Sequence, residues 1–287
     1  MGFFVQKRKP FSSEALSQLS NMVVSYVMPF YIFYTTATNS SLTLLNKAPL
    51  LVLMGVAVPL FGFVLAQPLL KLLNVSVEQK SIFQFCIMYG NTGFLGIPIS
   101  GFLFGSEGAF FAVMYNFGVM LVVFSLGMWL LSSGSSNSLK SLLGNPIMWS
   151  MIIGIVFAVA GIQLPQWIDQ PLATLSNLTL PIALLVAGAQ IGSVQFEKNS
   201  YTGHMITVAL SRLIVIPGLL IALFALLGWG NPDHKVMILE SAMPVGISST
   251  IFARNFGADS NFSAMATLWT TVLSLITLPL ITWLFLS

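Results

Sequence analysis

Two stretches of an otherwise apolar chain combine glycine, proline and small polar residues. The first is "GNTGFLGIPISG", residues 90–101, and the second is "ESAMPVGISST", residues 240–250. Glycine and proline weaken a helix and leave backbone N–H and C=O groups unpaired, which hydrocarbon cannot hydrogen-bond. Free N–H groups at the start of a half-helix favour an anion. Two such breaks at matched depth therefore predict a binding site for a small organic anion, with a packing kink as the simpler alternative.

The candidate binding residues belong to these stretches or to neighbouring spans. They are Asn91, Thr92, Gly93, Gly96, Pro98, Tyr115, Asn116, Arg212, Pro244, Gly246 and Ser248. Asn91 should face the crossing of the two broken spans, because its amide needs partners that hydrocarbon cannot supply. Tyr115 and Asn116 either hydrogen-bond substrate or make a core hydrogen bond.

Two charged residues lie inside predicted spans. Arg212 is a candidate counter-charge for a carboxylate, although snorkelling or a structural partner would explain it equally well. Glu240 is the candidate ion-coupling residue, for a proton or another cation, with a solvated position at the span edge as the alternative.

The remaining ionisable residues do not assemble a catalytic or metal site. His204 and His234 fall at opposite faces of the membrane, while Asp169, Asp233 and Asp259 lie at the ends of spans. An intramembrane hydrolase needs catalytic groups brought together. We therefore expect no enzyme activity, no cofactor and no bound metal.

The composition requires a lipid environment to position these residues. The chain has 287 residues, of which 56% are hydrophobic and only 7% charged, and its mean hydropathy is +0.90. Soluble domains carry about a quarter charged residues. The sequence therefore predicts an all-α polytopic membrane protein with the lipid bilayer as its partner, and the net charge of +3 gives no reason to expect nucleic acid.

Runs of roughly 20 apolar residues, the length that crosses a bilayer as a helix, recur along the whole chain. Four full spans belong to an N-terminal half, residues 1–137, and five to a C-terminal half, residues 138–287. The nine predicted spans are about 17–37, 48–71, 80–103, 108–132, 146–162, 167–189, 203–227, 235–254 and 261–286.

The distribution of lysine and arginine predicts the orientation, because basic residues accumulate in cytoplasmic loops. Eight basic residues lie on the side of the N-terminus and two, Lys47 and Lys235, lie on the other side. The eight are Lys7, Arg8, Lys9, Lys71, Lys80, Lys140, Lys198 and Arg254. We expect a cytoplasmic N-terminus and, after nine spans, a C-terminus outside the cell.

Prolines recur in the same order in the two halves. Pro29 corresponds to Pro181, Pro59 corresponds to Pro217, and a broken span follows in each half. Corresponding spans run in opposite directions, which predicts an inverted repeat of the kind found in secondary transporters. We expect the broken spans, 80–103 and 235–254, to cross with Gly93–Pro98 near Pro244–Ser248.

Three motifs give the chain a resemblance to the auxin efflux carrier family, which includes bacterial malate and malonate permeases. They are "GFFVQKRKPFSSEALSQLSNMVVSYVMPFYIF", "GNTGFLGIPI" and "MPVGISSTIFARNFGAD". The resemblance implies ten spans in two inverted sets of five, with the fourth and ninth helices broken and crossing near the midplane. Against that plan the chain lacks most of the first helix. Lipid, a second copy of the chain in a homodimer or an upstream piece of chain would then fill the resulting groove.

The expected function is secondary transport of small organic anions, such as carboxylates, across the cytoplasmic membrane by alternating access between two halves. The alternative within transporters resembles the sodium-coupled bile-acid family, which shares the crossed-helix plan. A channel or a receptor remains a further alternative, because pores also use breaks at the midplane.

Overall fold

The computed structural model describes residues 2–8, 10–39, 41–132, 143–193, 202–228 and 230–286. The boundary expected between the two halves, at 137/138, lies outside these residues, as do Lys9, Lys140 and Lys198. The α-helices are α1 (Gly2–Arg8), α2 (Ser13–Met22), α3 (Met28–Thr38), α4 (Leu42–Leu72), α5 (Val77–Met88), α6 (Ile97–Val122), α7 (Met128–Leu131), α9 (Pro146–Val159), α10 (Gln166–Ser193), α11 (Thr202–Leu210), α12 (Ile216–Leu226), α13 (Pro232–Ser241), α14 (Ser248–Asn255) and α15 (Ser260–Ile281). The π-helical segments are η1 (Val23–Val27), η2 (Thr92–Gly96), η3 (Val123–Gly127), η4 (Ser211–Val215) and η5 (Thr282–Leu286).

The all-helical class is confirmed for the part of the chain that the structure describes. The described residues hold no β-strand, only an isolated antiparallel bridge between Gly90 and Val245. Five helical stretches are long and apolar enough to cross a membrane: Thr43–Leu72, Thr92–Leu131, Gln166–Ala189, Thr202–Leu226 and Ser260–Phe285. The full count of nine spans and the inverted repeat remain predictions.

Proline explains three of the π-helical segments. Pro29, Pro98 and Pro217 each stand at the second position of the α-helix that follows η1, η2 and η4, respectively. A proline has no N–H to donate, so one carbonyl of the preceding turn loses its partner. The wider π turn lets a later N–H reach back to a carbonyl, and the helix continues in an environment without water.

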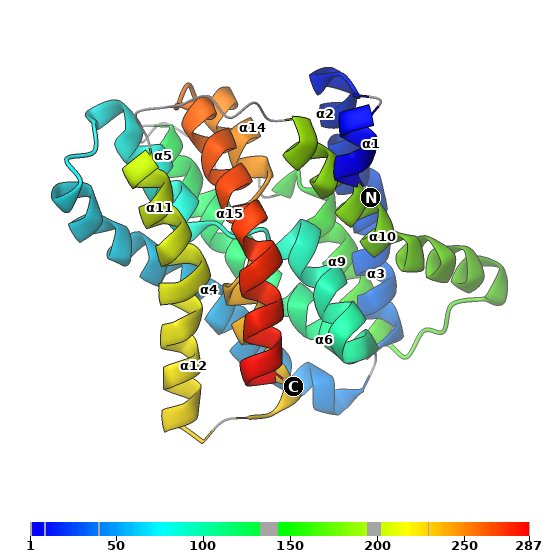
Figure 1. Ribbon diagram of the computed structural model, residues 1–287. Helices are drawn as coiled ribbons and strands as arrows, with labels where there is room; N and C mark the ends of the chain where they lie inside the picture. Colours follow the sequence, from blue (N-terminus) through cyan, green and yellow to red (C-terminus); the bar gives the residue numbers. More distant parts are fainter. Residues whose placement is uncertain are drawn as a thin grey trace.

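The helices pack as two bundles (Figure 1). In the first, called here the α3 bundle, α1, α2, η1, α3, α9 and α10 pack mainly against one another. In the second, the crossing bundle, α4 to α7 pack with α11 to α15 and with η2 to η5. Each bundle therefore takes helices from both halves of the sequence, because long-range packing brings α9 and α10 against α3 and α1.

Two predicted spans of the crossing bundle are interrupted. Helix α5 ends at Met88 and helical structure resumes at Thr92, while α13 ends at Ser241 and α14 begins at Ser248. The turn after the first broken span is a kink inside α6 at Gly105, whose φ of 70° and ψ of −162° are open to glycine but not to other residues.

Candidate functional site

The two broken spans meet through their backbones. The Asn91 N–H donates to the Pro244 carbonyl at 2.7 Å, and the Gly246 N–H donates to the Tyr89 carbonyl at 3.1 Å. The intervening Val245 N–H donates to the Thr270 hydroxyl of α15 at 3.0 Å. These bonds pair groups that would each cost several kcal/mol if left free in hydrocarbon, so each break supplies partners for the other.

The contact point differs from the one expected from the sequence. Residues 89–91 pair with residues 244–246, whereas the expectation placed Gly93–Pro98 beside Pro244–Ser248. The reason is that the helix already resumes at Thr92, so only residues 89–91 have free backbone edges. Gly93 instead faces the Asn116 side chain, and Gly96 faces Glu240.

The Arg212 guanidinium lies next to this crossing and contacts the backbone of both broken spans. Its Nε donates to the Met243 carbonyl at 3.0 Å, and its Nη1 approaches the Ile87 carbonyl at 3.5 Å. The Ile87 carbonyl belongs to the last turn of α5, and Met243 lies two residues beyond the end of α13. At both helix ends the dipole is negative and carbonyls lack helical partners. A side chain at Gly90 would collide with the guanidinium. Arg212 thus compensates both half-helix ends at once.

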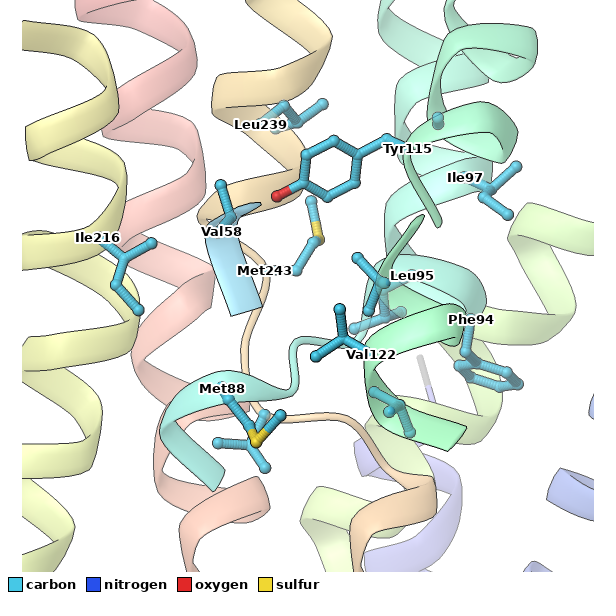
Figure 2. Close-up of a cluster of buried hydrophobic side chains, with 14 of the residues drawn as sticks. Val58, Met88, Phe94, Leu95, Ile97, Tyr115, Val122, Ile216, Leu239 and Met243 are labelled. Carbon is cyan, nitrogen blue, oxygen red and sulfur yellow. The ribbon is translucent and has the colours of Figure 1, made fainter. Parts of the chain in front are cut away.

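A buried hydrophobic cluster that includes Tyr115 surrounds the crossing (Figure 2). Figure 2 shows the Tyr115 ring between Leu239 and Met243, with its hydroxyl directed toward Val58. Among the described residues that hydroxyl is buried without a hydrogen-bond partner. The core hydrogen bond expected as one role of Tyr115 is therefore absent from the described residues, and a hydrogen bond to a substrate stays a prediction.

A cavity of about 360 Å³ lies between the two bundles beside the crossing. Its polar lining residues are Ser25, Tyr89, Asn91, Asn116, Asn145 and Ser248. Its apolar lining includes Met28 of the α3 bundle and Phe94, Phe124 and Phe252 of the crossing bundle. None of the described residues that line it is Asp, Glu, Lys, Arg or His.

Three helix N-termini open on this cavity. They are the start of η2 at Thr92, the start of α9 at Pro146 and the start of α14 at Ser248. The first N–H groups of a helix have no intrahelical acceptor and carry the positive end of its dipole. At α9 the Asn145 side-chain oxygen accepts a hydrogen bond from one of these groups, the Ile147 N–H, at 2.9 Å. These N-termini favour a negative charge in the cavity, although no described lining residue carries a cationic side chain.

The Asn91 amide adds a free donor at this point. The side chain is 3% exposed and lines the cavity, and its Nδ2 is buried without a hydrogen-bond partner among the described residues. Its neighbour Thr92 donates to Asn116 Oδ1 at 2.7 Å and fixes the orientation of that amide. A buried donor without a partner costs about 1–3 kcal/mol, and an anion in the cavity would remove that cost.

The residues predicted from the sequence fall into three places. Asn91, Gly93, Asn116 and Ser248 line the cavity, with Thr92 bonded to Asn116. Pro244 and Gly246 form the crossing itself. Gly96, Pro98, Tyr115, Arg212 and Glu240 are not among the residues that line the cavity.

Several contributing residues were not predicted. The Asn145–Pro146 pair could have been recognised from the sequence as a helix start, because an asparagine cap followed by proline is frequent at that position. Ser25, Tyr89, Ser100 and Thr270 carry no such local signal, since ordinary polar residues at those positions acquire a role only through packing.

Comparison with known proteins places the chain among transporters. A family profile described as membrane transport protein matches residues 1–140 and 130–282. An uncharacterized transporter of Methanocaldococcus jannaschii is 26% identical over the whole chain and 95% of its own length. The uncharacterized transporter YfdV of Escherichia coli K12 is 23% identical over the whole chain and 93% of its length. Auxin efflux carrier component 8 of Arabidopsis thaliana is 28% identical over 41% of the chain and 33% of its length.

Proposed function

The chain belongs to the membrane transport protein family, and we propose that it is a secondary transporter of small organic anions such as carboxylates in the cytoplasmic membrane. It is a multi-pass helical membrane protein, as the five membrane-length apolar helices and the family both indicate. The family also bears out the resemblance to auxin efflux carriers that its motifs indicated.

The observation that carries the proposal is the cavity beside the crossing. Three helix N-termini, the free amide of Asn91 and no acidic side chain among the described lining residues favour a negatively charged ligand. The absence of lysine and arginine from that lining favours a small, partly hydrated anion such as a carboxylate over a multiply charged phosphate ester. Its volume of about 360 Å³ is at the lower end of ligand pockets.

The position of the cavity between the two bundles supports alternating access as the proposed mechanism. Residues of the α3 bundle, such as Ser25 and Asn145, form one wall, and residues of the crossing bundle form the other. Arg212 and the paired breaks hold the half-helix ends together inside the crossing bundle. We therefore expect the crossing bundle to move as one body against the α3 bundle, carrying the anion with it.

The orientation proposed from the basic residues makes this an inward-facing arrangement. The cavity is lined by Ser25 of η1, between α2 and α3, and by Ile251 and Phe252 in the second half of α14. Helices α2 and α14 lie toward the end of the molecule that holds the α1–α2 and α14–α15 connections (Figure 1). That end is cytoplasmic if the N-terminus is.

The test is binding and uptake by purified protein with acetate, lactate, succinate, malate and malonate. We expect at least one carboxylate to raise the melting temperature and to be taken up by liposomes with saturation and stimulation by internal substrate. Non-saturable flux would indicate a channel, and binding without flux would indicate a receptor. Stimulation of uptake by sodium would favour the alternative, a sodium-coupled transporter resembling the bile-acid family.

The variant Asn91→Leu checks the site. It removes the amide donor at similar volume, and we expect it to weaken carboxylate binding by about 10- to 100-fold, as for a lost hydrogen bond to a charged group. The matched control is Asn255→Leu at the exposed end of α14, which should bind as the wild type does. Unchanged uptake by Asn91→Leu would remove the basis for this site.

A further inference from the structure

A second polar group lies near the crossing but outside the cavity. Glu240, in the last turn of α13, is 0% exposed. Its Oε1 accepts a hydrogen bond from the Ser100 hydroxyl of α6 at 2.8 Å, while its Oε2 is buried without a partner. The carboxyl thus has one fixed oxygen and one oxygen that nothing in the described protein satisfies.

The surroundings disfavour a permanent negative charge on Glu240. The C-terminal end of α13 already carries the negative end of a helix dipole. The titratable and charged groups that interact with Glu240 from the packed elements are Arg212 of η4, Tyr115 of α6 and Tyr31 of α3. Arg212 directs its donors to backbone carbonyls, and among the described residues it forms no ion pair with Glu240 within 4.0 Å. An uncompensated carboxylate out of water is costly, whereas a protonated one is neutral.

The packing around Oε2 favours a proton over a metal cation. A Cβ atom placed on Gly96 would lie 2.1 Å from Oε2 and 2.7 Å from Oε1, so the backbone of the helix at Gly96 closes this side of the carboxyl. Hard cations take several oxygen ligands at once. A proton needs only the lone pair of Oε2.

We propose that Glu240 is a proton-binding site that couples anion transport to proton movement in the same direction. This inference rests on the proposed function. In the step, Oε2 takes one proton from water on the side where the anion binds and gives it to water on the side where the anion leaves; only these O–H bonds form and break. Glu240 and most of the cavity wall belong to the crossing bundle, so proton and anion would move together.

The physical link is electrostatic and reciprocal. An anion at the helix N-termini and a charged Glu240 near the same crossing repel one another across a medium of low dielectric constant. Neutralising Glu240 therefore favours anion binding, and by linkage anion binding favours protonation to the same extent. The expected consequence is tighter carboxylate binding as the pH falls.

The experiment compares wild type with Glu240→Gln in proteoliposomes, using the five carboxylates named above. The glutamine keeps an acceptor for Ser100 and mimics the neutral acid. With the outside more acidic by about two pH units, wild type should accumulate a monocarboxylate up to about 100-fold. Glu240→Gln should exchange internal for external carboxylate at equal pH, yet gain nothing from the gradient, and its affinity should no longer vary with pH.

Glu107→Gln is the matched control, because Glu107 is exposed beside the Gly105 turn, and it should respond to the gradient as wild type does. A gradient response retained in Glu240→Gln, or wild-type uptake that ignores the gradient, would overturn the coupling role and leave the transport function standing. Wild type that takes up none of the carboxylates would count against the proposed function instead.

A second measurement does not depend on substrate or on the variant folding. Dicyclohexylcarbodiimide reacts with protonated carboxyls in apolar surroundings, and mass spectrometry of wild-type peptides locates the adduct. We expect Glu240 to be labelled more at acidic than at alkaline pH. Labelling that is absent, or equal at both values, would refute the proton site.

Discussion

At the scale of single residues, the role of Arg212 changes once its partners are known. A buried arginine in an apolar span is expected to mark a ligand. Here the side chain is 2% exposed, and its donors reach the Met243 and Ile87 carbonyls at the ends of two half-helices. Its charge therefore stabilises the crossing, and under the proposed function we expect backbone N–H groups and amides to recognise the substrate.

This assignment predicts a loss of stability in Arg212→Gln. The variant loses the cationic hydrogen bonds to both carbonyls, and we expect about 3 kcal/mol of destabilisation, as for hydrogen bonds to a charged donor. Thermal unfolding in detergent measures it, and the control is Arg254→Gln, at an exposed position at the end of α14. The control should stay within about 0.5 kcal/mol. A stable Arg212→Gln protein that has lost only anion binding would restore the counter-charge role expected from the sequence.

At the scale of elements, close packing of helices sets the geometry of the crossing bundle. Helices α4 and α6 approach through two glycines: a Cβ on Gly55 would lie 2.0 Å from the Tyr115 carbonyl, and one on Gly118 would lie 2.1 Å from the Val52 carbonyl. Small residues allow this approach in membranes, where van der Waals contact replaces the hydrophobic effect as the main attraction between helices. Because α6 also carries Asn116 and follows the first break, this contact positions the cavity wall.

The change Gly118→Ala should therefore force α4 and α6 apart. The obstructing atom is a backbone oxygen that cannot rotate away, so we expect a cost of about 1–3 kcal/mol. Gly218→Ala in α12 is the matched control, because no described atom beyond its chain neighbours and its own helix backbone lies within 4 Å of the added Cβ. That control should be neutral or stabilising by up to about 1 kcal/mol. Equal melting temperatures for the two variants would contradict the close approach.

At the scale of the whole molecule, the ends of the helices and the basic residues define an orientation. The α1–α2 and α14–α15 connections lie at one end, and the α12–α13 connection and the C-terminus lie at the other (Figure 1). Lys7 and Arg8 end α1 and Arg254 lies in the last turn of α14, at the first end. Lys235 lies in α13 close to the second end. We infer that the first end is cytoplasmic.

A pair of reporters fused after Ser287 tests this orientation. Alkaline phosphatase, active only outside the cytoplasm, should be active there, whereas green fluorescent protein should be dark. The same reporters fused after Arg254, close to the opposite end, should give the reverse pattern. Fluorescence of the C-terminal fusion would overturn the inferred orientation. It would also overturn the proposal that the cavity faces the cytoplasm.

What the sequence determined by itself is local in origin. Mean hydropathy and apolar runs depend on neighbouring residues alone, so the helical membrane class could be predicted directly. The bounds of three apolar helices, Gln166–Ala189, Thr202–Leu226 and Ser260–Phe285, also agree with the predicted spans to within one residue. Glycine and proline act on their own backbone, so the breaks at 89–91 and 242–247 were also predictable. The motifs that indicated the family are likewise short and contiguous.

Only the tertiary structure decided what those breaks contact. The pairing of Asn91 with Pro244, the carbonyls bound by Arg212 and the enclosure of Glu240 by Ser100 and Gly96 join residues from distant parts of the chain. Spacing along a helix gives depth in the membrane but not which side of a crossing a side chain occupies. Depth alone therefore predicted that Arg212 and Asn91 belong to one site. In the structure the Asn91 side chain lines the cavity, whereas the Arg212 guanidinium binds backbone carbonyls outside it.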